Sequence, residues 1–284
     1  MELKNISIPL NDDEISIKLI SFLDKFGFLK NESKFLDEVC KEIRDLKEEH
    51  FGGCSDENEF RDNLKYNLFK DEHIKDYPKE RIDLNKIAEN ISGAVQKIKD
   101  IIGKKEILIY VFPTCSDFVA KKLGGVWGLI AWDDILHIFV NPVENWELNL
   151  KSTILHELAH CMQDYYTYEM TLFEHLISDG LAEHFQEGFL KGNRNSFTKI
   201  ISKNDAKKIF RKLKPYFNKT MNEYPEIHSD LFFGSKDYIS GTGYTIGYYL
   251  IEDYLIENGI KEIDWNKLFS QKPAKFKPKS FFQN

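Results

Sequence analysis

The stretch TILHELAHCMQDY, residues 153–165, is the starting point for interpreting the chain. It contains two histidines, His156 and His160, four positions apart, with Glu157 directly after the first. The remaining residues before the second histidine are mostly apolar: Ile154, Leu155, Leu158 and Ala159. Such spacing is typical of a helix that packs against a core. We therefore expect an α-helix here, with both histidines on one face.

A metal ion is one explanation of this pair. Residues i and i+4 of an α-helix stand one turn apart on the same face, so His156 and His160 can both direct a ring nitrogen at one Zn²⁺ ion. Glu157 lies about 100° around the helix from His156, where its carboxylate can take a proton from a metal-activated water without ligating the metal. The alternative is a buried helix whose histidines are merely hydrogen-bonded, so the rest of the chain must supply a third ligand.

The segments before this helix predict a small β-sheet. Three runs are rich in β-branched and aromatic residues, as buried strands are: ILIYVFP (107–113), GGVWGLIAWDD (124–134) and ILHIFVNP (135–142). Residues 12–104, by contrast, show mostly helical spacing, for example in SIKLISFLDKFGF (16–28). Helical spacing returns near Leu148 and continues almost to the C-terminus, where QKPAKFKPKSFFQN (271–284) is expected to be extended or loose.

This order of segments predicts an α+β fold, with a mainly helical N-terminal part and a small sheet that precedes the helix carrying the histidines. We expect residues 1–104 to form the helical region, residues 105–271 the domain with the histidines, and residues 272–284 a basic C-terminal tail. All three parts could also form one compact unit.

Composition excludes several classes of protein. The chain has 284 residues, of which 42% are hydrophobic and 30% charged, as in ordinary globular domains. Its net charge of −7 argues against binding to nucleic acid. No apolar run is long enough to span a membrane, and MELKNISIPLNDDEIS lacks the basic and apolar regions of a signal peptide. We expect a cytoplasmic protein whose four scattered cysteines are free thiols.

A second informative stretch is LISDGLAEHF, residues 176–185, in which Asp179 stands nineteen positions after His160. The segments GGVWG, HELAH and SDGLAEHF occur in this order, and GTGYTIGYYLIEDYL (241–255) follows them. Together they resemble the gluzincin metallopeptidases, and most of all the bacterial YjaZ-like family of predicted Zn-dependent proteases. The resemblance covers roughly residues 107–255.

The resemblance implies a zincin-like fold and one Zn²⁺ ion per chain, bound by His156, His160 and Asp179. It also implies that Glu157 is the general base in the hydrolysis of a peptide or protein substrate. Glutamate is usual in the family where this chain has Asp179, and aspartate is one methylene group shorter, so its carboxylate reaches about 1.5 Å less.

The departure at Asp179 leaves the third ligand open. Glu183, one helical turn later on the same face, is the competing candidate. If Asp179 is the ligand, Glu183 or Asp164 is expected to accept a hydrogen bond from a ligand histidine, unless these carboxylates simply face solvent. His175 and His184 flank this stretch and are expected to be partly exposed, and His137 and His228 have no partner at ligand spacing.

Further residues are candidates for substrate binding. In zincins the strand before the histidine helix commonly pairs with an extended peptide, which points to Gly124, Gly125 and Trp127, although the glycines equally suit a turn and the tryptophan a core. Tyr244, at the expected start of a later helix, is the candidate donor to the oxyanion. Three other tyrosines compete with it: Tyr238, Tyr248 and Tyr249.

Two alternatives to a peptidase remain. The first is a catalytically inactive protein that keeps the zincin-like fold for binding or regulation, for which Asp179 is the sequence support. The second is a metal-dependent hydrolase of a non-peptide amide, which the same residues permit. The intact Glu157 argues against the first alternative, because a purely structural metal site has no need of this carboxylate.

Overall fold

The structure is a computed structural model that describes residues 1–10, 14–48, 50–69, 82–103, 106–132, 134–167, 169–191 and 198–283. The chain forms two compact units, Met1–Glu157 and Leu158–Asn284. The division between them falls within one continuous helix, α5 (Trp146–Cys161). Among the described residues, none of the helices has the length and apolar character needed to cross a membrane.

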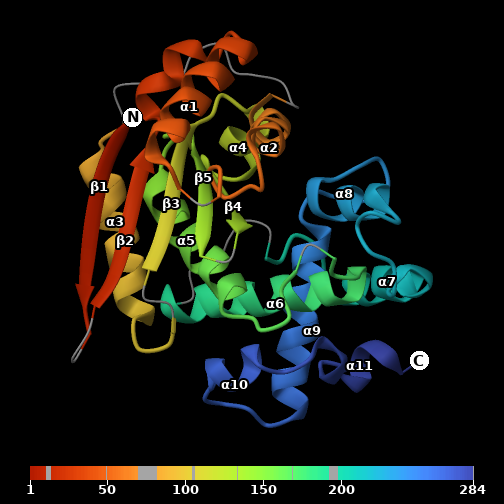
Figure 1. The fold of residues 1–284 in the computed structure, drawn as a ribbon. Helices are drawn as coiled ribbons and strands as arrows, with labels where there is room; N and C mark the ends of the chain where they lie inside the picture. Colours follow the sequence, from red (N-terminus) through yellow and green to blue (C-terminus); the bar gives the residue numbers. More distant parts are fainter. Residues whose placement is uncertain are drawn as a thin grey trace. The chain divides into compact units, whose positions relative to one another are not determined.

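A five-stranded sheet of order β1-β2-β3-β5-β4 is the centre of the first unit (Figure 1). β1 (Glu2–Pro9) and β2 (Glu14–Ser21) are antiparallel. β3 (Glu106–Pro113) runs parallel to β2 on one side and to β5 (Ile135–Val140) on the other. β4 (Val126–Trp132) pairs antiparallel with β5 and forms an edge. The three strands predicted before the histidine helix are therefore confirmed, and the fold is mixed α+β.

Three of the predicted helical stretches of the N-terminal part are helices, α1 (Glu32–Leu46), α2 (Glu57–Phe69) and α3 (Leu84–Ile98), but its first strands were not expected, and the helical prediction for SIKLISFLDKFGF was wrong. SIKLISFLDKFGF contains most of strand β2 followed by a 3-10 helix, η1 (Leu23–Phe28). Ile15, Ile17 and Leu19 are fully buried and alternate with exposed or half-buried residues, which is the period of a strand. The apolar run is short enough to suit either period, and pairing with β3 selects the strand.

Helices cover both faces of this sheet. α1 (Glu32–Leu46) and α2 (Glu57–Phe69) pack on the face that carries Tyr110, Phe112 and Phe139. On the opposite face, Gly128 meets Thr153 and Glu157 of α5, and α3 (Leu84–Ile98) runs behind the β1–β2 pair (Figure 1). Because apolar residues point from both faces of β3 and β5 into packed layers, these strands are apolar along nearly their whole length.

The second unit is helical and is organised around two long helices. α6 (Leu172–Phe189) crosses α9 (Thr242–Glu257) (Figure 1). Gly180 of α6 meets Gly247 of α9. The described residues of this unit also form shorter α-helices: α7 (Lys203–Leu213), α8 (Pro225–Phe233), α10 (Trp265–Phe269) and α11 (Lys279–Phe282).

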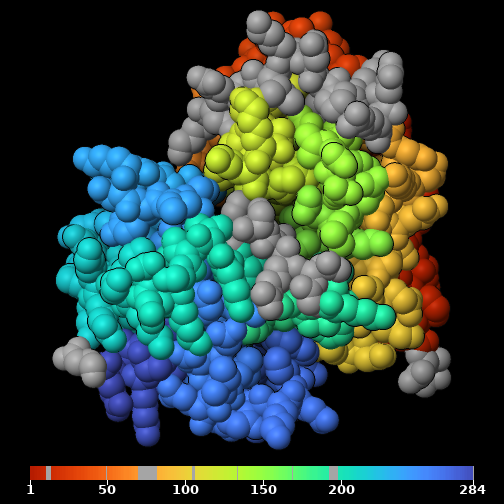
Figure 2. Space-filling view, turned by 180° about the vertical axis from the view of Figure 1, so that it is seen from behind, coloured from red at the N-terminus to blue at the C-terminus, as the bar shows by residue number. Residues whose placement is uncertain are grey.

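The sequence suggested that the C-terminal residues form a loose tail, but in the structure they pack against the second unit. Phe276 and Phe281 are fully buried, and the ring of Phe281 lies 5.3 Å from that of Phe210 on α7. Figure 2 shows the dark-blue C-terminal residues lying against the rest of the second unit. Aromatic side chains among the lysines and prolines thus anchor a segment whose average composition is that of a linker.

Candidate metal centre

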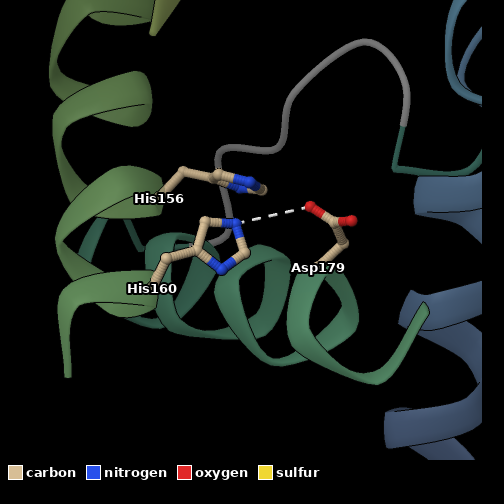
Figure 3. A group of neighbouring side chains, drawn as sticks. All are labelled: His156, His160 and Asp179. Carbon is tan, nitrogen blue, oxygen red and sulfur yellow. Dashed lines mark ion pairs between the residues drawn. The ribbon is translucent and has the colours of Figure 1, made fainter. Parts of the chain in front are cut away.

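Helix α5 presents both motif histidines. His156 and His160 stand one turn apart near its end and are 7% and 5% exposed. Fully buried neighbours, Leu155 and Ala159, hold the helix against the core. In Figure 3 the two imidazoles leave the same side of α5, as the i, i+4 spacing requires.

Helix α6 presents the carboxylate. The helix begins with a capping box, in which Thr171 and Glu174 satisfy each other's backbone N–H groups. Asp179 follows two turns later and is 8% exposed. One nitrogen each from His156 and His160 and one oxygen of Asp179 all lie within 4.8 Å of one another, and Figure 3 shows the three side chains converging. The structure therefore brings together the three residues proposed from the sequence as ligands.

A chain of hydrogen bonds sets the tautomer of the neutral His160 ring. Nε2 of Gln163 donates to the backbone carbonyl of Ser178 at 3.1 Å, so the amide oxygen of Gln163 is the end that faces the Ser178 hydroxyl and accepts its proton at 2.6 Å. The Ser178 oxygen lies 2.8 Å from Nδ1 of His160. Because the Ser178 hydroxyl already donates its hydrogen bond to Gln163, its oxygen must accept a hydrogen bond from an N–H at Nδ1. Nε2 of a neutral His160 is then left without a proton.

This tautomer explains why the site suits a cation. Nε2 of His160 faces Oδ1 of Asp179 at 3.4 Å (Figure 3), and both atoms are acceptors when the imidazole is neutral. Two acceptors in a buried place need a positive charge between or on them. Two ligands of one tetrahedral zinc ion, each about 2.0–2.1 Å from it, are about 3.4 Å apart. The two nitrogens and one carboxylate oxygen could therefore hold a metal ion.

Glu157 lies beside this group on the sheet side of α5. It is 7% exposed, and its Cγ packs over the backbone of Gly128 in β4. Thr153 lies one turn before Glu157 on α5, and both side chains pack against Gly128. The stem of the carboxylate is therefore held between α5 and the sheet.

The two other acidic candidates have separate surroundings. Glu183 is buried and accepts hydrogen bonds from Nε2 of Gln186 at 2.8 Å and from Oγ1 of Thr198 at 2.5 Å. Asp164 is exposed in the turn after α5. At Nδ1 of His160, the place predicted for one of these carboxylates is taken by Ser178. Sequence reasoning missed this residue, although it directly precedes Asp179.

A ring cluster extends from the Asp179 turn towards Tyr244. His175 lies one turn before Asp179 on α6, and its ring is 5.1 Å from that of His228 and 5.8 Å from that of Phe232. Phe232 in turn packs edge-on against Tyr244 at 5.0 Å. His228, left without a role in the sequence, owes its place to the packing of α8, for which the local sequence carries no signal.

Both histidines of this cluster are neutral near pH 7. Burial lowers the pKa of His228 to about 4, and the neighbouring His175 acts in the same direction. Burial also lowers the pKa of His175. His175 and His228 therefore add no positive charge beside Asp179.

The residues predicted to bind substrate along the strand have clear packing roles. Gly124 and Gly125 adopt left-handed φ values of 61° and 88° in the turn before β4, a conformation that glycine adopts readily. A Cβ on Gly124 would collide with Asn149, and one on Gly125 with the carbonyl oxygen of Asn141. Trp127 is half-buried, with its ring 5.7 Å from that of Phe139. These contacts account for the three residues within the fold.

Comparison with known proteins gives one match. The model of the family described as "Predicted Zn-dependent protease (DUF2268)" matches residues 87–273. This segment is well over half of the chain and runs from α3 to the residues just after α10, so it includes the whole candidate centre. None of the curated proteins matches the chain.

Proposed function

This chain belongs to the family of predicted Zn-dependent proteases, and we propose from that premise that it hydrolyses peptide bonds with one Zn²⁺ ion held by His156, His160 and Asp179. The observation that carries the proposal is the approach of Nε2 of His160 to Oδ1 of Asp179 at 3.4 Å, two acceptors that a cation would join. Within the family we assign the chain to the YjaZ-like branch and to the zincin-like fold, on its ordered segments GGVWG, HELAH and SDGLAEHF.

The residues divide the chemistry between them. A zinc ion bound at such a site polarises a carbonyl group and acidifies water. Glu157 is the general base: its carboxylate takes a proton from the attacking water and then delivers it to the leaving nitrogen. Its place on α5, one position from His156 and on the side of the helix that meets β4, supports this role.

Two elements are proposed to orient the substrate. β4 is an edge strand of the described sheet, which supports pairing of an extended peptide near Gly124, Gly125 and Trp127. Tyr244 is the proposed donor to the carbonyl oxygen as negative charge develops on it. Its support is the ring cluster, which connects Tyr244 through Phe232 and His175 to the turn that carries Asp179.

The decisive experiment combines metal analysis with turnover. The purified chain should contain about one zinc per molecule, and His156→Ala, His160→Ala and Asp179→Ala should each lose it. Glu157→Gln should keep the zinc but lose cleavage of a quenched fluorescent peptide library. Retained cleavage in Glu157→Gln would refute the assigned base.

Tyr244→Phe tests the donor separately. It should retain zinc and lower kcat about 10²–10³-fold, as the loss of one oxyanion donor does. Tyr254→Phe, a change of the same kind on the same helix, serves as the control and should leave kcat near the wild-type value. Zinc binding without cleavage of any peptide or simple amide would instead favour a binding protein with the same fold.

A further inference from the structure

Gly128 is the point of β4 on which α5 rests. A Cβ atom at this position would lie 2.6 Å from Cγ2 of Thr153, 2.9 Å from Cγ of Glu157 and 3.1 Å from Cδ1 of Ile138. Carbon atoms in contact are normally about 3.5–4.0 Å apart. The absence of a side chain at Gly128 is therefore what allows α5 to lie directly on the strand.

The backbone at Gly128 gives no other reason for glycine. Gly124 and Gly125 have positive φ values, but Gly128 does not. It sits in a regular antiparallel pair opposite Ile138, a place where glycine weakens a strand. The position thus uses the small size of glycine and not its conformational freedom.

We propose that Gly128 is a positioning residue for Glu157. Its bare backbone lets the methylene stem of Glu157 lie against β4, and this contact sets how far the carboxylate reaches towards the reacting groups. The inference rests on the proposed function, because it takes Glu157 as the general base. It also gives the GGVWG segment a purpose in the site that differs from substrate binding.

The contact cannot be relieved by a small side-chain motion. Thr153 is β-branched, and a threonine in a helix has only two favoured χ1 rotamers. The Glu157 atom concerned is Cγ, in the stem of the side chain and not at its free end. A methyl group at position 128 would therefore displace the carboxylate, and an error of about 1 Å in the position of a catalytic group can cost about 10²-fold in rate.

A methyl group at position 128 would contact both Thr153 and Glu157. Replacing Thr153 makes it possible to separate the effect of this methyl group on stability from its effect on activity. Gly128→Ala alone should lower both stability and activity, because the new Cβ meets both side chains. In Gly128→Ala/Thr153→Ala the contact with Cγ2 of Thr153 is gone and the contact with Glu157 stays. The contacts with Glu157 and with Cδ1 of Ile138 remain, so this double variant should regain only part of the stability lost in Gly128→Ala. It should hold zinc like the control Thr153→Ala, while kcat on the peptide library stays about 10–100-fold lower with KM little changed.

A second readout does not depend on turnover. Acetohydroxamate binds zinc and has a proton that a nearby carboxylate can accept, so its affinity for the zinc-loaded protein reports where Glu157 is. Calorimetry should show binding about tenfold weaker in Gly128→Ala/Thr153→Ala than in Thr153→Ala. Glu157→Gln should show a similar loss.

The outcomes distinguish this inference from the proposed function. If the double variant binds acetohydroxamate and turns over like Thr153→Ala, Gly128 serves packing alone and the inference is wrong. If the wild type binds acetohydroxamate with the predicted pattern but cleaves no peptide, positioning of Glu157 stands and the peptidase activity fails. If the wild type holds no zinc, both proposals fall.

Discussion

Gly180 and Gly247 touch through their backbones where α6 crosses α9. A Cβ on Gly180 would collide with the carbonyl oxygen of Gly247, and a Cβ on Gly247 with the carbonyl oxygen of Leu176. Asp179 directly precedes Gly180 on α6. The crossing therefore fixes the height of the helical turn that brings the carboxylate to His160.

Gly247→Ala should weaken both the fold and the metal site. Forcing a methyl group between the helices should cost about 1–3 kcal/mol of the free energy of unfolding and lower zinc affinity by moving Asp179. Urea unfolding and competition with a chelating dye measure the two effects. The control is Gly188→Ala on α6, whose new Cβ would have an ordinary contact of 3.9 Å with Trp265 and should stabilise the helix by about 0.5–1 kcal/mol. Equal stability of the two variants would contradict a close crossing.

Asp179→Glu should bind zinc less well than the wild type, although glutamate is the usual residue in the resembling family. The contact of Gly180 with Gly247 prevents α6 from retreating, so the longer side chain, which reaches about 1.5 Å further, must bend away. We expect a loss of about tenfold or more.

Glu183→Gln should keep the zinc, since Gln186 and Thr198 already engage this carboxylate. The reverse pattern would identify Glu183 as the third ligand.

Ser178→Ala should reduce zinc affinity about 10–100-fold without abolishing binding. The change removes the acceptor at Nδ1 of His160, so the imidazole loses the bond that fixes its tautomer and orientation. Gln163→Leu breaks the same chain one bond further out and should have a smaller effect in the same direction. Ser202→Ala, which removes the N-cap of α7, should change thermal stability only. Unchanged zinc affinity in Ser178→Ala would show that packing alone orients His160.

The first unit should lose stability below neutral pH because of His137. Burial lowers the pKa of this histidine to about 4, while in the unfolded chain it is about 6.5. The unfolded state therefore takes up the proton first, so the contribution of His137 is complete above pH 6.5 and is lost as the pH falls towards 4. The pH dependence of urea unfolding between pH 7 and pH 4.5 should be smaller in His137→Phe.

His137→Phe retains a ring against Phe60 and Phe112 but loses the bond to the carbonyl of Gly52. It should therefore be less stable than the wild type at pH 7, and the two proteins should converge as the pH falls. His228, whose pKa is also lowered, is present in both proteins and cancels in the comparison. If the stability of the wild type and of His137→Phe falls equally with decreasing pH, other groups cause the loss of stability in acid.

Local patterns predicted those elements whose apolar spacing has a single interpretation. The strands at residues 106–140 and helices α1, α3 and α5 are of this kind. Residues 14–21 suit a helix as well as a strand, and only the pairing of β2 with β3 decides between them. Pairing across some 90 residues of chain lies outside any local window, so the sequence could not supply it.

In the candidate centre, too, some residues could be predicted from local patterns and others could not. His156, His160 and Glu157 share one helix, so their arrangement follows from spacing alone. Asp179 came from the resemblance, while the roles of Ser178 and Gly128 depend on which groups face them after folding. A serine or a glycine has no local pattern that distinguishes a support of the site from an ordinary polar or small residue.

The strand order has a consequence for synthesis on the ribosome. β1 and β2 emerge before β3 and can pair with each other, but β3, the next neighbour of β2, ends only at Pro113. Translation adds about 5–20 residues each second, so roughly 90 residues, and several seconds, separate β2 from β3. During this interval the edge of β2, with Ile17 and Leu19, has no strand to pair with, and such edges invite aggregation. The nascent chain of this protein should therefore depend on chaperones most strongly before residue 113 has left the exit tunnel.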